Sequence, residues 1–126
     1  MPAPLIGITG RRLRFGAIRE ASPTYADETV TVFFAAFADA VARAGGLPVF
    51  VPFEAAATDV VARLDGLVVT GGADIDQARW GGPRTDVGDP LENPAATDPV
   101  RDDYEEALLQ AALGTELIRA DGLVLQ

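Results

Sequence analysis

The feature that most constrains the fold is a buried apolar run that ends in two glycines and an acidic turn, Leu67-Val68-Val69-Thr70-Gly71-Gly72-Ala73-Asp74-Ile75-Asp76. A parallel strand covered on both faces is a continuous run of Val, Leu and Ile rather than an alternation. The glycine pair permits a sharp turn and leaves backbone N–H groups uncovered by side chains. Because open α/β sheets bind ligands beside the carboxyl ends of their strands, we expect a binding loop here.

Apolar strands and helical patterns alternate along the first half of the chain. The expected strands are residues 4–9, 47–52 and 67–70, the expected helices 27–44 and 55–64, and the expected loop 10–24. A β-α-β-α-β order with short connections implies parallel strands and right-handed crossovers. The predicted fold class is therefore α/β, as a three-layer domain with a short parallel sheet.

The second half of the chain predicts a long loop and then one helix. Glycines and prolines break any regular pattern between residues 81 and 99. Asp98-Pro99 is a helix start, with an N-cap followed by proline at the first helical position, and Gly114 is the expected stop. The segment 122–126 is a candidate fourth strand.

Composition excludes several classes of function. The 126 residues predict one domain, and the net charge of −9 argues against nucleic acid and anionic membrane as partners. The sequence has no Cys and no His, which excludes disulfides, thiol catalysis and imidazole chemistry within it. No apolar run is long enough to span a membrane and no signal-peptide pattern is present, so we expect a soluble cytoplasmic protein.

Five segments, in order, carry a resemblance to a known family. They are residues 4–9, 44–49 with Pro52, 65–76, 78–81, and 98–102 followed by Glu105. Together they resemble the N-terminal half of class I glutamine amidotransferase-like proteins, in the γ-glutamyl-γ-aminobutyrate hydrolase branch (peptidase C26). The resemblance implies a flavodoxin-like fold, with a sheet that is truncated relative to the family.

The resemblance also implies a reaction, the hydrolysis of γ-glutamyl amides by a Cys nucleophile with a His base. Attack on the amide carbonyl gives a tetrahedral oxyanion that backbone N–H groups must face. By resemblance, the loop at Gly71 and Gly72, with Asp74, supplies one such donor. The alternative for these residues is a tight turn that serves the fold alone.

The sequence departs from the family where the catalytic groups belong. The Cys-bearing elbow, the His and its acidic partner are all missing, so we assign no catalytic residue and expect no turnover by this chain alone. Residues 1–126 are read as a single partial domain. A partial sheet exposes an edge, so we expect either self-association or a complementing second chain that brings the missing groups.

Two residues of the last expected helix are candidates for binding a substrate. Arg101 has the fork that binds carboxylates, and its alternative role is an ion pair with one of the many acidic residues. Glu105 is either an inward-facing polar group or a first-turn helix acid.

No metal or cofactor is expected. Asp74 and Asp76 make a weak cation signal without a third ligand. Ser22, the only serine, lacks a base to activate it.

Two classes of function stay open at this point. The first is a γ-glutamyl amide hydrolase, active only with a partner. The second is a non-catalytic module that binds a small molecule or assembles with another protein.

Overall fold

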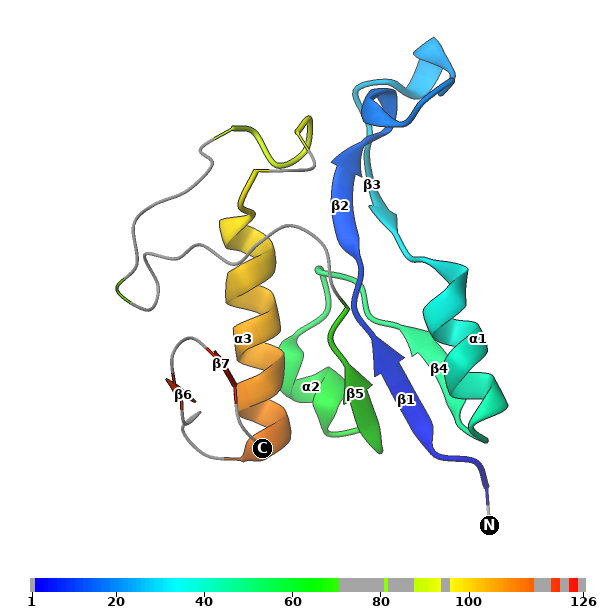
Figure 1. Cartoon of the computed structure of the whole chain (residues 1–126), viewed down its shortest axis with the longest axis vertical. Helices are drawn as coiled ribbons and strands as arrows, with labels where there is room; N and C mark the ends of the chain where they lie inside the picture. Colours follow the sequence, from blue (N-terminus) through cyan, green and yellow to red (C-terminus); the bar gives the residue numbers. More distant parts are fainter. Residues whose placement is uncertain are drawn as a thin grey trace.

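A three-stranded parallel sheet forms the centre of the chain. The computed structural model describes residues 2–70, 81, 88–93 and 96–114, and the backbone of strands at 119–120 and 123–124. Strands β1 (Leu5–Ile8), β4 (Leu47–Phe50) and β5 (Gly66–Val68) lie in the order β4-β1-β5, with β1 in the middle (Figure 1). The predicted short parallel sheet is confirmed, although each strand is one to two residues shorter than the apolar run that predicted it.

Helices cover both faces of this sheet. Helix α1 (Ala35–Arg43) connects β1 to β4, and α2 (Ala57–Val61) connects β4 to β5. A Cβ added at Gly46 would meet both Val41 of α1 and Ile6, whereas one added at Gly7 would lie 2.5 Å from Leu64 Cδ1, just beyond α2. Neighbouring residues of a strand face opposite sides, so the two connections cover opposite faces. The predicted α/β class is confirmed.

A β-hairpin replaces the loop that the sequence predicts after the first strand. Strand β2 (Arg11–Arg14) pairs antiparallel with β3 (Thr29–Val32), and the hairpin extends beyond the carboxyl end of the sheet (Figure 1). The loop prediction for residues 10–24 is therefore wrong over β2. Three of the four residues of β2 are arginines, so the segment lacks the apolar pattern typical of a buried strand. Hydrogen bonds to β3, rather than apolar burial, hold this strand and satisfy its backbone polar groups.

The same hairpin shortens the first helix, which was predicted for residues 27–44. The alternating Thr29-Val30-Thr31-Val32 is β-branched throughout, and such side chains favour a strand over a helix. Helix α1 begins only at Ala35. Phe33 stacks on Phe50 with ring centroids 4.3 Å apart, so this residue of the predicted helix packs against β4 from outside α1.

Prolines occupy the outer edge of β4. Leu47 donates its N–H to Pro4 O of the neighbouring strand entry, and Val51 donates to Ile8 O. By the alternation of a parallel ladder, positions 48, 50 and 52 then direct their backbone nitrogens away from the sheet. Pro48 and Pro52 have no N–H to offer, which blunts this edge against another strand.

Helix α3 (Pro99–Leu113) packs against α2. It begins at the predicted N-cap, where the Asp98 carboxylate accepts from Arg101 N, and it ends at Gly114, whose φ of 69° is left-handed. Leu108 is fully buried, whereas Ala112, one turn further along the helix, is exposed.

Among the strands that the structure describes, the short β6 (Arg119–Ala120) and β7 (Leu123–Val124) pair with each other and with no other strand. The predicted fourth strand therefore does not join the parallel sheet. Among the described residues, no helix is long and apolar enough to cross a membrane.

Candidate functional site

The order of the strands sets the position of the site. The chain leaves the central strand β1 toward β4 and returns on the other side as β5. The strand order therefore reverses between β1 and β5, and such a switch point, at the carboxyl ends of the strands, is where doubly wound sheets bind their ligands. Thr9 follows β1 directly, and Thr70 comes two residues after β5.

Thr9 and Thr70, the threonine pair, are joined by their backbone and side-chain polar groups. Thr70 N donates to Thr9 Oγ1 at 3.0 Å, and Thr70 Oγ1 donates to Thr9 O at 3.0 Å. Thr9 N in turn donates to Val68 O at 3.1 Å. Thr9 is only 2% exposed, so these bonds form away from bulk water. They fix the point where the chain leaves β5.

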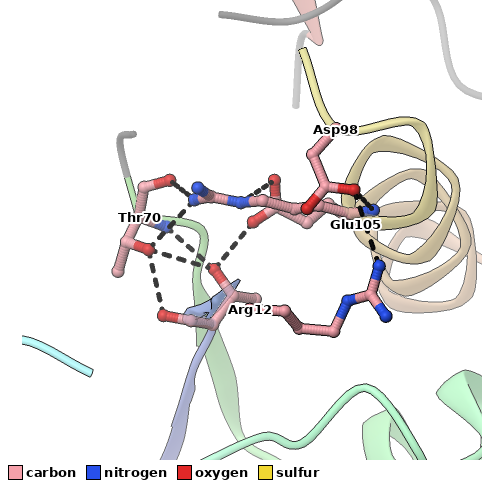
Figure 2. A network of polar contacts seen from close by, with 6 residues as sticks. Arg12, Thr70, Asp98 and Glu105 are labelled. Carbon is pink, nitrogen blue, oxygen red and sulfur yellow. Dashed lines mark hydrogen bonds and ion pairs between the residues drawn. The ribbon is translucent and has the colours of Figure 1, made fainter. Parts of the chain in front are cut away.

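Helix α3 brings a charged pair to the same place (Figure 2). Arg101 and Glu105 are four residues apart and therefore share one face of the helix. Their side chains are 4% and 12% exposed, and Arg101 Nε donates to Glu105 Oε1 at 3.3 Å. Arg101 Nη2 donates to Thr70 O at 2.6 Å and to Thr70 Oγ1 at 3.3 Å. Thr9 Oγ1 donates to Glu105 Oε2 at 2.8 Å.

Burial changes the acidity of this site. It raises the pKa of the Glu105 carboxyl above its usual value, because the ionised form loses hydration. The nearby Arg101 guanidinium and the hydrogen bond from Thr9 lower that pKa without cancelling the effect of burial, and the carboxylate of Asp102 raises it further. The ionised form of Glu105 therefore depends on the hydrogen bonds that Thr9 and Arg101 donate to it.

A second cation flanks the network. Arg12 of β2 lies with Nη2 3.8 Å from Asp98 Oδ1 (Figure 2). Its guanidinium carbon is 5.5 Å from the centroid of the Phe53 ring. Phe53 also contacts the ring of Tyr104, at a centroid distance of 5.4 Å. The hairpin is therefore tied to the start of α3, and Asp98 serves both as helix cap and as ion-pair partner.

A shallow depression opens above the threonine pair. It is lined by residues from the ends of β1 and β5 and from the base of the hairpin: Thr9, Gly10, Arg11, Val32, Phe34 and Thr70. Phe34 is 64% exposed, which leaves an apolar wall at the rim. The depression is small, about the size of one water molecule, and it lies directly beside the hydrogen-bonded threonine pair.

The predicted site residues divide into two groups. Gly71, Gly72 and Asp74 lie outside the described residues, as does Asp76. Arg101 and Glu105 are brought together at the carboxyl edge, where Glu105 faces inward and Arg101 makes the ion pair that was the alternative to substrate binding. Their contact with a substrate stays a prediction.

The sequence analysis missed Thr9 as part of the site. A threonine directly after an apolar run of the sequence occurs twice, in Ile8-Thr9 and Val69-Thr70, and this repetition is the signal that was available. The hydroxyl of Thr70 serves the backbone, since it donates to Thr9 O. Among the described residues, no three Asp or Glu side chains gather as a potential metal site.

The fold is an α/β sheet whose switch point carries a polar network of Thr9, Thr70, Arg101 and Glu105 beside a small depression. The family model named peptidase C26 matches residues 4–117. The chain therefore belongs to the peptidase C26 family, within the class I glutamine amidotransferase-like hydrolases. No curated protein matches the chain significantly.

Proposed function

We propose that this chain forms the substrate-loop part of a γ-glutamyl amide hydrolase site, of the γ-glutamyl-γ-aminobutyrate hydrolase type. The observation that carries the proposal is the fixed position of Thr70 at the switch point. Thr9 and Arg101 hold its N–H, hydroxyl and carbonyl groups. The glycine pair that resembles the family's oxyanion loop begins at the next residue.

Hydrolysis of an amide by a thiolate requires backbone N–H donors near the reacting carbonyl, and we propose that this loop supplies one. A thiolate that attacks the amide carbonyl turns the carbonyl oxygen into an oxyanion, and an N–H placed against that oxygen stabilises the transition state. Loss of one such donor typically costs about 100- to 1,000-fold in rate. Donors of this kind must be fixed before the reaction, and the buried contacts around Thr70 supply that rigidity.

The thiol and the imidazole would come from outside these 126 residues, since the sequence contains neither Cys nor His. Ser22 is no substitute, because its hydroxyl oxygen accepts from Thr24 N as a helix cap. It belongs to the turn between β2 and β3, at the end of the hairpin away from the sheet (Figure 1). We therefore propose that the isolated chain binds γ-glutamyl amides without cleaving them.

Calorimetry and an assay of glutamate release test this proposal together. The ligand is γ-glutamyl-γ-aminobutyrate, and free γ-aminobutyrate is the control that lacks the γ-glutamyl group. At 100 times Kd, specific binding adds about 2.7 kcal/mol to the free energy of unfolding. We expect binding of the amide alone and no glutamate release. Equal behaviour of the two ligands, or turnover by the pure chain, would contradict the proposal.

Assembly through the sheet is a second candidate, favoured by the difference between the two outer edges. The β4 edge carries Pro48 and Pro52, whereas β5 has no proline and pairs only with β1 among the described strands. We propose that a strand of a second polypeptide adds at β5. Sedimentation at micromolar concentration tests for a second copy, and a monomer that also gains no mass from a Cys-bearing family partner would contradict assembly.

A further inference from the structure

We propose that Arg101 and Glu105 are positioning residues, which set the orientation of the peptide unit that leads from Thr70 into the glycine pair. For its chemical purpose this inference rests on the proposed function. It differs from the substrate contact that the sequence predicted for both residues, because it assigns them an action through the threonine pair.

The backbone carbonyl of Thr70 is held by Arg101. Arg101 Nη2 lies 2.6 Å from this oxygen, which makes it the shortest hydrogen bond described in the site. A carbonyl and the N–H that follows it belong to one planar unit. A fixed Thr70 carbonyl therefore fixes the plane of the peptide unit that leads out of Thr70 toward the glycine pair.

Arg101 is itself held in place by contacts of its backbone and of its side chain. Its backbone N–H is capped by Asp98, its Nε donates to Glu105 Oε1, and its side chain is 4% exposed. Nε and Nη2 both donate to protein acceptors, so these atoms cannot form a bidentate pair with a substrate carboxylate. The planar fork sends one N–H to the acid and another to Thr70, a geometry that lysine cannot reproduce.

Glu105 sets the direction of the Thr9 hydroxyl. A threonine hydroxyl has one proton, and here that proton is donated to Glu105 Oε2 at 2.8 Å. The lone pairs of Thr9 Oγ1 are then free to accept from Thr70 N at 3.0 Å. A protonated Glu105 gains a donor of its own and competes for the same lone pairs. Arg101 and Asp102 are the charged groups that act on Glu105 from the described elements.

Backbone NMR of the full chain without ligand tests the role of Arg101. The variant Arg101→Lys keeps the charge and loses the fork, while Arg43→Lys is the matched control in the exposed i,i+4 pair with Asp39. We expect a shifted Thr70 carbonyl carbon resonance in Arg101→Lys only. An unchanged Thr70 carbonyl resonance in this folded variant would overturn the inference.

Amide hydrogen exchange tests the role of Glu105. The reference is Val51 N, which donates to Ile8 O on the other side of the sheet. In Glu105→Gln we expect exchange of the Thr70 amide to rise at least about tenfold relative to Val51, because one local hydrogen bond is weakened. A proportional rise at both amides would show a purely structural role and overturn the inference.

The wild-type chain provides a readout that needs no variant to fold. The Thr70 amide resonance should titrate with the carboxyl of Glu105, and that titration should vanish in Glu105→Gln. A Thr70 resonance that does not move with pH would overturn the inference. These measurements use no ligand, so a chain that passes them and fails to bind γ-glutamyl amides loses only the proposed function. A chain that binds the amide and fails them loses only the positioning role.

Discussion

Thr9 Oγ1 lies 2.8 Å from Glu105 Oε2, which joins the end of the first strand to the last described helix across 96 residues of sequence. The same hydroxyl accepts from Thr70 N, so one buried oxygen connects β1, β5 and α3. The carboxyl edge of the sheet is therefore held by polar contacts. Substitutions that remove these contacts should alter the structure of the site before that of the rest of the sheet.

Thr9→Val should destabilise the chain by about 1–3 kcal/mol, because the isosteric side chain removes the hydroxyl that donates to Glu105 Oε2 and accepts from the Thr70 amide. Urea denaturation measures the loss. Thr29→Val, on an exposed position of β3, is the control and should stay within about 0.5 kcal/mol of wild type. Similar losses in the two variants would argue that the Thr9 hydroxyl has no special role.

Glu105→Gln should change how stability depends on pH. A carboxyl whose pKa is raised by folding binds its proton more tightly in the folded state. Its stabilising contribution is full below the unfolded pKa of about 4.3 and is lost as pH rises through the folded pKa.

The free energy of unfolding of wild type minus that of Glu105→Gln should therefore fall across this window and level off above it. Urea titrations at a series of pH values measure the difference. A difference that rises with pH over the same range would show that the ion pair with Arg101 outweighs burial.

Asp98→Ala should cost about 1–2 kcal/mol, since it removes the cap of α3 and leaves Arg12 without its described ion-pair partner. Thermal or urea unfolding measures the effect. Asp39→Ala removes a carboxylate from an exposed i,i+4 pair with Arg43 and should cost no more than about 0.5 kcal/mol. Equal losses would mean that the cap contributes little.

Pro48→Val should increase self-association, because it restores an outward N–H in the middle of the β4 edge. Light scattering and sedimentation at rising concentration measure the change. Pro23→Ala, in the short 3-10 helix η2 (Pro23–Tyr25) at the hairpin turn, is the control and should leave the oligomeric state unchanged. A Pro48→Val chain that behaves as wild type would show that the prolines do not protect this edge.

The sequence predicted those parts of the fold whose signals are local and strong. Continuous apolar runs located β1, β4 and β5, and the Asp98-Pro99 start and Gly114 stop located α3. The hairpin was missed for a local reason. The β2 strand is rich in arginine, and the apolar residues of β3 run directly into the periodic pattern of α1.

The site was harder to predict because its contacts join distant residues. The pattern around Arg101 and Glu105 predicted polar groups on α3, but their partners Thr70 and Thr9 lie 31 and 96 residues away along the chain. No local periodicity reports such contacts. Only the order of the strands, with β1 between β4 and β5, brings these residues to one edge.

The most direct test of the central claim is a map of amide NMR shifts on addition of γ-glutamyl-γ-aminobutyrate. We predict that the largest perturbations fall on Thr9, Gly10 and Thr70, around the depression at the switch point, with the ligand recovered intact. Perturbations centred instead on the separate depression at Phe53 and Tyr104, or no perturbation at saturating ligand, would contradict it.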